Sequence, residues 1–84
     1  MNKEQLKEYI ECGNEIEFKY NNIMYSITYG TFNNERLISF YEFYKESTEV
    51  RTFEELIKVT RNNITVLQMR ESLTEKDVWI YWLS

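Results

Sequence analysis

Carboxylates are the groups in this sequence that could support acid–base chemistry. The chain has 14 Asp and Glu residues, but only one Cys and no His. Glu54 adjoins Glu55, and Glu71 stands four residues before Glu75, which is about one helical turn. One carboxyl of a close pair can donate a proton while the other accepts one. Such pairs are far more often ordinary side chains on the solvent-exposed face of a helix. We therefore expect no catalytic residues and a protein that is not an enzyme.

The residue types that the chain lacks exclude most other catalytic mechanisms. Without His there is no imidazole base to activate a Ser or Cys nucleophile. One Cys and one Asp, Cys12 and Asp77, do not make an ordinary zinc ligand set or a calcium loop. Gly13 and Gly30 stand too far apart to form a glycine-rich phosphate loop. We therefore expect no metal and no cofactor, and we expect Cys12 to be a buried thiol at a helix end.

The net charge of −4 argues against direct contact with DNA or RNA. Binding to phosphates needs clustered Lys and Arg, whereas the ten basic residues here are separated and interleaved with Glu. Residues 1–50 hold the whole acidic excess, with nine Glu against five Lys or Arg. This distribution favours a protein partner with a basic surface.

Length and composition predict one small domain over residues 1–84. The chain is 43% hydrophobic and 17% aromatic, which is too apolar for a disordered segment. No apolar run approaches the roughly 20 residues of a membrane helix, so we expect no membrane contact. The first residues, MNKEQLKEY, lack the basic segment and apolar core of a signal peptide. A cytoplasmic protein is the expectation.

Apolar spacing in the first half of the chain predicts a helix followed by an antiparallel meander. Residues 3–12 suit a capped helix, and EIEFKY and IMYSITY alternate in the manner of strands. Asn21-Asn22 would join these two strands in a hairpin. After a loop over 30–35, a third strand is expected over 36–44.

The second half of the chain is less regular. Thr52 and Glu55 predict a short capped helix. Residues 66–73 favour another helix, although IKVT and ITVL could instead pair as a small hairpin across 61–63. The final strand is DVWIYWL. The predicted fold is therefore α+β, a four-stranded antiparallel sheet (the three-strand meander plus the C-terminal strand) with short helices on one face, in the order α-β-β-β-α-α-β.

Strand alternation assigns side chains to two faces of this sheet. The covered face would carry Ile16, Phe18, Ile23, Tyr25, Ile27, Ile38, Phe40, Val78 and Ile80. The other face would carry Glu17, Lys19, Met24, Ser26, Thr28, Ser39, Tyr41, Trp79 and Tyr81. A β-bulge near Tyr41-Glu42 would turn Phe43 into the core and leave Tyr44 outside. The outer aromatics either stabilise the sheet by cross-strand packing or anchor an interface.

We expect the interface to combine acidic and aromatic side chains, namely Tyr41, Glu42, Tyr44, Glu46, Glu49, Trp79 and Tyr81. Such a surface fits a stoichiometric inhibitor that occupies a basic groove on a nucleic-acid enzyme. An immunity protein or antitoxin, small and acidic for a similar reason, is an alternative. A homodimer that uses the sheet face or an edge strand is another.

Four segments carry a resemblance, namely EIEFKY, YSI, SFYEFYKESTEV and TFEEL. They resemble short uncharacterised proteins of low-GC Gram-positive bacteria and their phages and mobile elements. In size and acidity the chain is also similar to phage-encoded inhibitors of bacterial defence, including anti-CRISPR proteins. That similarity implies a non-enzymatic protein that binds a defence nuclease or effector. It assigns no role to individual residues.

Overall fold

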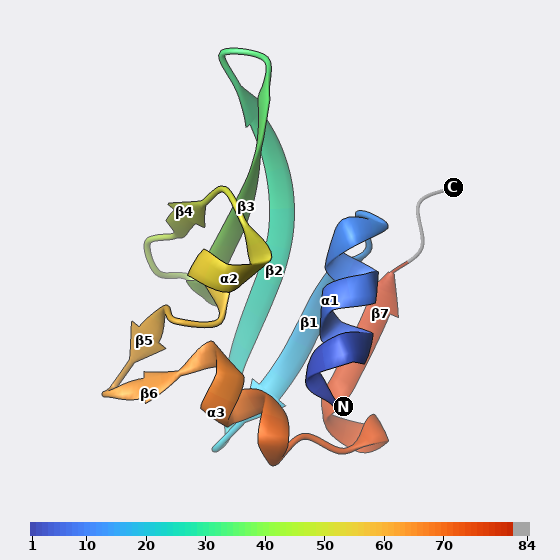
Figure 1. Ribbon diagram of the computed structural model, residues 1–84. Coiled ribbons are helices and arrows are strands. Elements are labelled where there is room, and N and C mark those ends of the chain that lie inside the picture. The colour runs from blue at the N-terminus through green and yellow to red at the C-terminus, as the bar shows by residue number, and fades with distance from the viewer. Residues whose placement is uncertain (82–84) are drawn as a thin grey trace.

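The computed structural model describes residues 1–81, which form a five-stranded sheet, a two-stranded sheet and short helices. The elements are α1 (Lys3–Glu11), β1 (Glu15–Tyr20), β2 (Ile23–Phe32), β3 (Glu35–Glu42), β4 (Thr48–Val50), α2 (Phe53–Leu56), β5 (Thr60–Arg61), β6 (Ile64–Thr65), α3 (Val66–Glu71), the 3₁₀ turn η1 (Glu75–Asp77) and β7 (Val78–Tyr81). The large sheet is antiparallel, with strand order β4-β3-β2-β1-β7 (Figure 1). The predicted α+β class and antiparallel sheet are confirmed, but the sheet has one strand more than predicted.

Three Asn-Asn pairs form the tight hairpin turns. Both residues of Asn21-Asn22, Asn33-Asn34 and Asn62-Asn63 have positive φ, between 51° and 66°. A two-residue hairpin turn needs this left-handed conformation, which Asn adopts more readily than most residues. The first turn was predicted. The second replaces the predicted loop over 30–35, because β2 continues to Phe32 and β3 begins at Glu35, so this hairpin projects beyond the rest of the sheet (Figure 1).

The segment between α2 and α3 contains both structures that the sequence left as alternatives. Thr60 pairs with Thr65 and Arg61 with Ile64, which makes the small hairpin. Helix α3 begins at the next residue, and the Thr65 hydroxyl accepts a hydrogen bond from the Gln68 amide at 3.1 Å. Thr65 can end a strand and cap a helix because a helix N-cap has extended backbone.

The strand that the prediction missed is β4, inside the polar segment KESTEV. Val50 pairs with Ile38 and Thr48 with Phe40, so β4 forms one edge of the large sheet. Three residues are too few to give a clear alternating pattern. At the other edge, β7 pairs with β1, as Val78 opposite Phe18 shows. Residues 82–83 of the predicted final strand lie outside the described residues.

The three helices are short and are held by their caps. Helix α1 has nine residues and begins with a reciprocal capping box, in which the Gln5 amide donates to Asn2 Oδ1 at 2.8 Å. Thr52 caps α2 by accepting from the Glu55 amide at 3.1 Å, as predicted. No helix within residues 1–81 is long and apolar enough to cross a membrane.

Cys12 forms the C-cap of α1, and its thiol is exposed. The predicted burial of this thiol is therefore wrong, although the helix does end there. Leu6 and Ile10 fill the inward positions of the helix, one turn apart. Cys12 lies outside that stripe, so packing does not require its burial.

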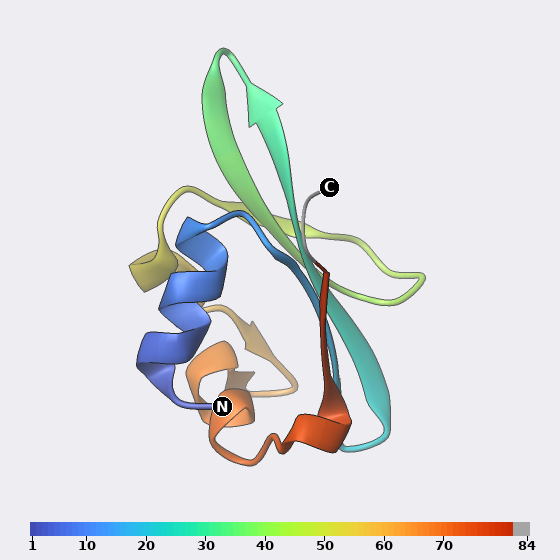
Figure 2. The same ribbon diagram turned by 90° about the vertical axis from the view of Figure 1, so that its right-hand side faces the viewer.

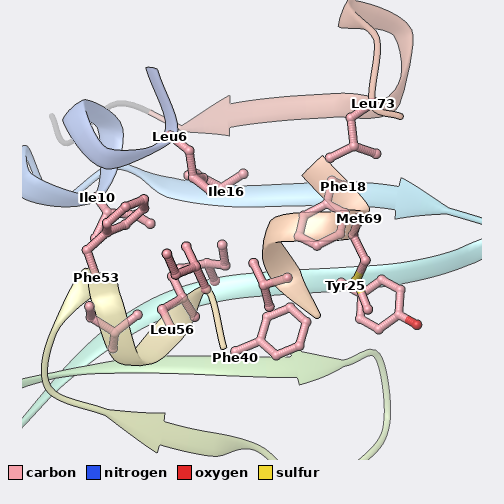
Figure 3. Packing of buried hydrophobic residues seen from close by; sticks show 14 residues of the cluster. Leu6, Ile10, Ile16, Phe18, Tyr25, Phe40, Phe53, Leu56, Met69 and Leu73 are labelled. Atoms are coloured by element: carbon pink, nitrogen blue, oxygen red, sulfur yellow. The ribbon is translucent and has the colours of Figure 1, made fainter. Parts of the chain in front are cut away.

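All three helices lie over one face of the large sheet, and the core forms between the two layers (Figures 1 and 3). The rings of Phe18, Tyr25 and Phe40 stack across β1, β2 and β3, with centroids 5.3 and 5.5 Å apart. Burying each such side chain contributes about 1.5 to 3 kcal/mol. The predicted covered face is confirmed: six of its nine residues are buried, and Ile23, Val78 and Ile80 pack against them.

Candidate functional site

Within residues 1–81, no helix covers the other face of the large sheet (Figure 2). The strand register aligns Trp79, Glu17, Ser26 and Tyr41 in a row across β7, β1, β2 and β3. Directly paired residues point to the same side of a sheet, so these side chains share the uncovered face. We call this the open face. By the same register it also carries Glu15, Lys19, Met24, Thr28, Ser39, Glu49 and Tyr81.

The aromatic residues of the open face and the adjoining β3–β4 loop form two clusters instead of one stripe. Next to β3, the ring of Tyr41 lies 6.4 Å from that of Phe43, which meets Tyr44 edge-on at 6.2 Å. On β7, Trp79 and Tyr81 are 43% and 47% exposed. Because β1 and β2 separate β3 from β7, the two clusters lie about 14 Å apart, or three strand spacings. Glu17, Lys19, Met24, Ser26 and Thr28, on β1 and β2, lie between them.

Phe43 belongs to the first cluster and not to the core, so the predicted bulge is wrong. The pairing of β2 with β3 stays regular as far as Tyr25 opposite Glu42, and the Phe43 amide donates to the Met24 carbonyl at 3.0 Å. Unbroken alternation then puts Phe43 on the same side as Tyr41. No bulge is needed because Glu42 stands at the end of the strand, where it pairs with Lys45 at 3.5 Å.

Tyr44 is the most exposed aromatic residue that the structure describes, and its backbone is left-handed, with φ of 67°. A hydrogen bond of 3.0 Å from the Lys45 amide to the Glu42 carbonyl closes the turn that contains it. The third position of such a turn usually takes Gly or Asn when φ is positive. Another residue there costs about 1 to 2 kcal/mol. In Figure 2 this loop extends beyond the sheet on the side opposite the helices.

A hydrogen bond between neighbouring strands orders the second cluster. The Tyr81 hydroxyl donates to the Glu17 carboxylate. This bond favours the protonated phenol and so raises the pKa of Tyr81 above its ordinary value. The Tyr81 ring is thereby held toward β1, beside Trp79, which is the direct partner of Glu17 in the ladder.

Several carboxylates on this side of the molecule have no basic partner. Among residues 1–81, no ion pair includes Glu15, Glu17, Glu46 or Glu49. Lys19 is the one basic residue that the register places on the open face. Glu49 accepts hydrogen bonds from the hydroxyls of neighbouring serines, which leave its charge in place. The open face and its adjoining loop therefore carry carboxylates that form no ion pair with a basic residue in the described part of the chain.

The seven residues predicted for the interface do not all lie together. Tyr41, Glu49, Trp79 and Tyr81 share the open face, and Tyr44 and Glu46 lie on the loop between β3 and β4. Glu42 differs from the rest. The register puts it on the covered side, where its side chain is 18% exposed and pairs with Lys45.

The predicted interface left out four residues that the structure leaves at least partly exposed, namely Phe43, Glu15, Glu17 and Phe32. Phe43 stands two residues after Tyr41, so simple alternation would have found it. Glu15 and Glu17 were visible as acids on a predicted strand, but only the register brings them beside the aromatics of β7. Phe32, which is 64% exposed near the tip of the β2–β3 hairpin, was hidden in a predicted loop.

The carboxylate pairs considered for catalysis lie elsewhere. Glu54 and Glu55 are exposed on α2, and Glu71 and Glu75 are exposed on α3 and η1. No cluster of three or more Cys, Asp or Glu side chains suited to a metal ion occurs within residues 1–81.

No protein-family model matches the chain, and no curated protein or solved structure is significantly similar to it. Its function must therefore be inferred from the open face and the loop beside it.

Proposed function

We propose that this chain is a non-enzymatic module that binds another protein and inhibits it by occupying a basic groove. The binding surface, here called the acidic-aromatic surface, consists of Tyr41, Phe43, Tyr44, Trp79 and Tyr81 with Glu15, Glu17, Glu46 and Glu49. The observation that carries the proposal is that exposed rings stand beside carboxylates that have no basic partner within residues 1–81.

The aromatic residues supply the anchors of the proposed complex. Tyr and Trp are enriched among interface residues with the largest binding energies, because they bury a large area and lose few rotamers. Tyr81 is already held by Glu17, so it has less freedom to lose on binding. Tyr44 keeps an unfavourable backbone conformation and a wholly exposed ring, which contribute little to the fold.

The carboxylates supply selectivity for a basic partner. Acidic groups opposite Lys and Arg speed association and suppress binding to acidic proteins. Grooves dense in Lys and Arg are typical of proteins that bind nucleic acid through its phosphates. We therefore favour a nucleic-acid enzyme as the target, specifically a bacterial defence nuclease or effector. This is the mode of action that the resemblance to anti-CRISPR proteins in size and acidity implies.

Affinity capture from a bacterial lysate tests the proposal, with three forms of the chain as bait. One is the wild type, and a second replaces Glu46 and Glu49 by Gln. The third replaces Glu54 and Glu55 by Gln, which changes the charge equally on the helical side. We expect the wild type and the third bait to retain a nucleic-acid enzyme that added duplex DNA displaces, and the second bait to retain much less.

Two results would contradict the proposal. Equal retention of the same proteins by all three baits would show that the acidic-aromatic surface is not used. A toxin as the retained protein would overturn the inhibitor assignment and identify an immunity protein or antitoxin instead.

A further inference from the structure

The two edges of the large sheet differ in how they are protected. Strand β4 has only three residues, with exposed Glu49 at its centre, and Arg61 donates to the Thr48 hydroxyl at 2.8 Å. Strand β7 reads VWIY, without a charge or a Pro. Proteins usually protect a sheet edge with short strands, charges or Pro, because an open edge invites another strand. Within residues 1–81, no strand pairs with the outer side of β7.

A hollow adjoins this edge on the covered side of the sheet. Its volume is about 290 Å³, and it lies between α1 and β7. Its lining residues are Met1, Gln5, Tyr9, Thr74, Glu75, Val78 and Ile80. Val78 and Ile80 stay partly exposed there, whereas Ile16 and Ile27, on the neighbouring strands, are almost wholly buried. A strand added beside β7 would direct alternate side chains into this hollow.

We propose that the strand occupying this edge is β7 of a second copy of the chain. An antiparallel β7–β7 pair has two-fold symmetry, so each copy gives and receives the same contacts. The strand has the required alternation: Val78 and Ile80 point inward, and Trp79 and Tyr81 point outward. Pairing would join two five-stranded sheets into one of ten strands. The protected β4 strands would then form both outer edges.

The charges near β7 permit this self-association despite the net charge of −4. Five of the seven residues that line the hollow are neutral; Met1 carries the N-terminal ammonium and Glu75 a carboxylate, so the charges there are of opposite sign. In the dimer, Glu17 and the Glu17 of the second copy would be three strand spacings apart, about 14 Å. Exposed charges are largely screened beyond about 8 Å at physiological salt. The acidic excess of the chain therefore lies mostly away from the edge that would be joined.

The dimer would also change the acidic-aromatic surface. It brings the Trp79 and Tyr81 clusters of both copies together at the centre of one continuous open face. The inference does not depend on the proposed function, because the edge and the hollow exist whether or not that face binds a partner.

Sedimentation velocity over a wide range of protein concentration tests the proposal. The forms to compare are the wild type, Trp79→Lys and the matched control Thr28→Lys, which puts the same charge on a central strand of the open face. We expect a two-fold mass for the wild type and Thr28→Lys, and a single-chain mass for Trp79→Lys. A wild type that stays monomeric at every concentration would overturn the proposal, and so would a dimer that Trp79→Lys leaves intact.

Circular dichroism checks that Trp79→Lys remains folded, as the 43% exposure of Trp79 leads us to expect. If Trp79→Lys does not fold, amide hydrogen exchange of the wild type tests the dimer instead. Protection of the β7 amides must rise with protein concentration, and unchanged protection would refute the dimer. A monomeric wild type would not affect the capture experiment, so the two proposals can fail separately.

Discussion

The two faces of the large sheet come from the same strands but make different contacts. Phe40 and Tyr41 are adjacent on β3, yet Phe40 is fully buried under the helices, while Tyr41 lies partly exposed on the open face. Successive residues of a strand point in opposite directions, so one strand can contribute to the core and to a surface at once. Substitutions on one face should therefore affect stability, and those on the other should affect binding.

Two tyrosines illustrate the same difference. On the covered side, burial raises the pKa of Tyr29 to about 12, and its hydroxyl donates to the Asn14 carbonyl at 2.7 Å. On the open face, the hydrogen bond to Glu17 raises the pKa of Tyr81. The first pKa shift comes mainly from removal of the phenol from water, and the second comes mainly from the hydrogen bond to the partly exposed Glu17.

The largest effect should separate the two faces directly. Phe40→Ala should lower the free energy of unfolding by about 3 to 5 kcal/mol, because it leaves a cavity within the stacked rings. Tyr41→Ala should cost only about 1 kcal/mol, from lost packing against Phe43. Urea denaturation of both variants measures this. Equal losses would mean that the open face is as necessary to the fold as the core.

The second prediction concerns alkaline pH. The raised pKa of Tyr29 means that the fold favours the neutral phenol, so its contribution is complete below pH of about 10 and is lost as the pH rises towards about 12. In that interval the wild type should lose stability as the pH rises, by less than the limiting slope of about 1.4 kcal/mol per pH unit, because Tyr29 is partly exposed and solvent weakens its interactions. Tyr29→Phe should flatten the slope, and Tyr81→Phe should change it less. Denaturation at several alkaline pH values measures the slope for both variants. A larger change for Tyr81→Phe than for Tyr29→Phe would mean that Tyr81, and not Tyr29, makes the larger contribution to the loss of stability.

The third prediction concerns the loop beside the open face. Tyr44→Gly should be more stable than Tyr44→Ala by about 1 kcal/mol, because both lose the ring but only Gly adopts positive φ without strain. Both variants should bind a partner of the acidic-aromatic surface less well. Thermal denaturation gives the first comparison. If Ala is as stable as Gly, the left-handed backbone of Tyr44 stores no strain.

The covered face was predictable because its pattern is long and regular. Ile16 and Phe18 on one strand, with Tyr25 and Ile27 on the next, alternate with polar residues, and the Asn21-Asn22 turn fixes their register. Such alternation reports directly which side of a strand is buried. Short elements gave no such signal, and β4 was missed for that reason.

The open surface was only partly predictable, because it depends on which strands become neighbours. The sequence identified Trp79 and Tyr81 as outward, but not that β7 lies beside β1 and brings Glu15 and Glu17 next to them. The predicted bulge near Tyr41-Glu42 would have kept Glu42 off the covered side. A polar residue at a strand end can reach solvent or a nearby Lys, so alternation needed no such correction at Glu42.

The most direct test of the acidic-aromatic surface is the association rate with the captured partner at low and high salt. For the variant with Glu46 and Glu49 replaced by Gln, association at low salt should be slower than for the wild type, by up to about tenfold. High salt should largely abolish this difference, and replacing Glu54 and Glu55 by Gln on the helical side should leave the rate near that of the wild type. If the Glu46 and Glu49 variant associates as fast as the wild type at low salt, the surface does not steer binding and the account is wrong.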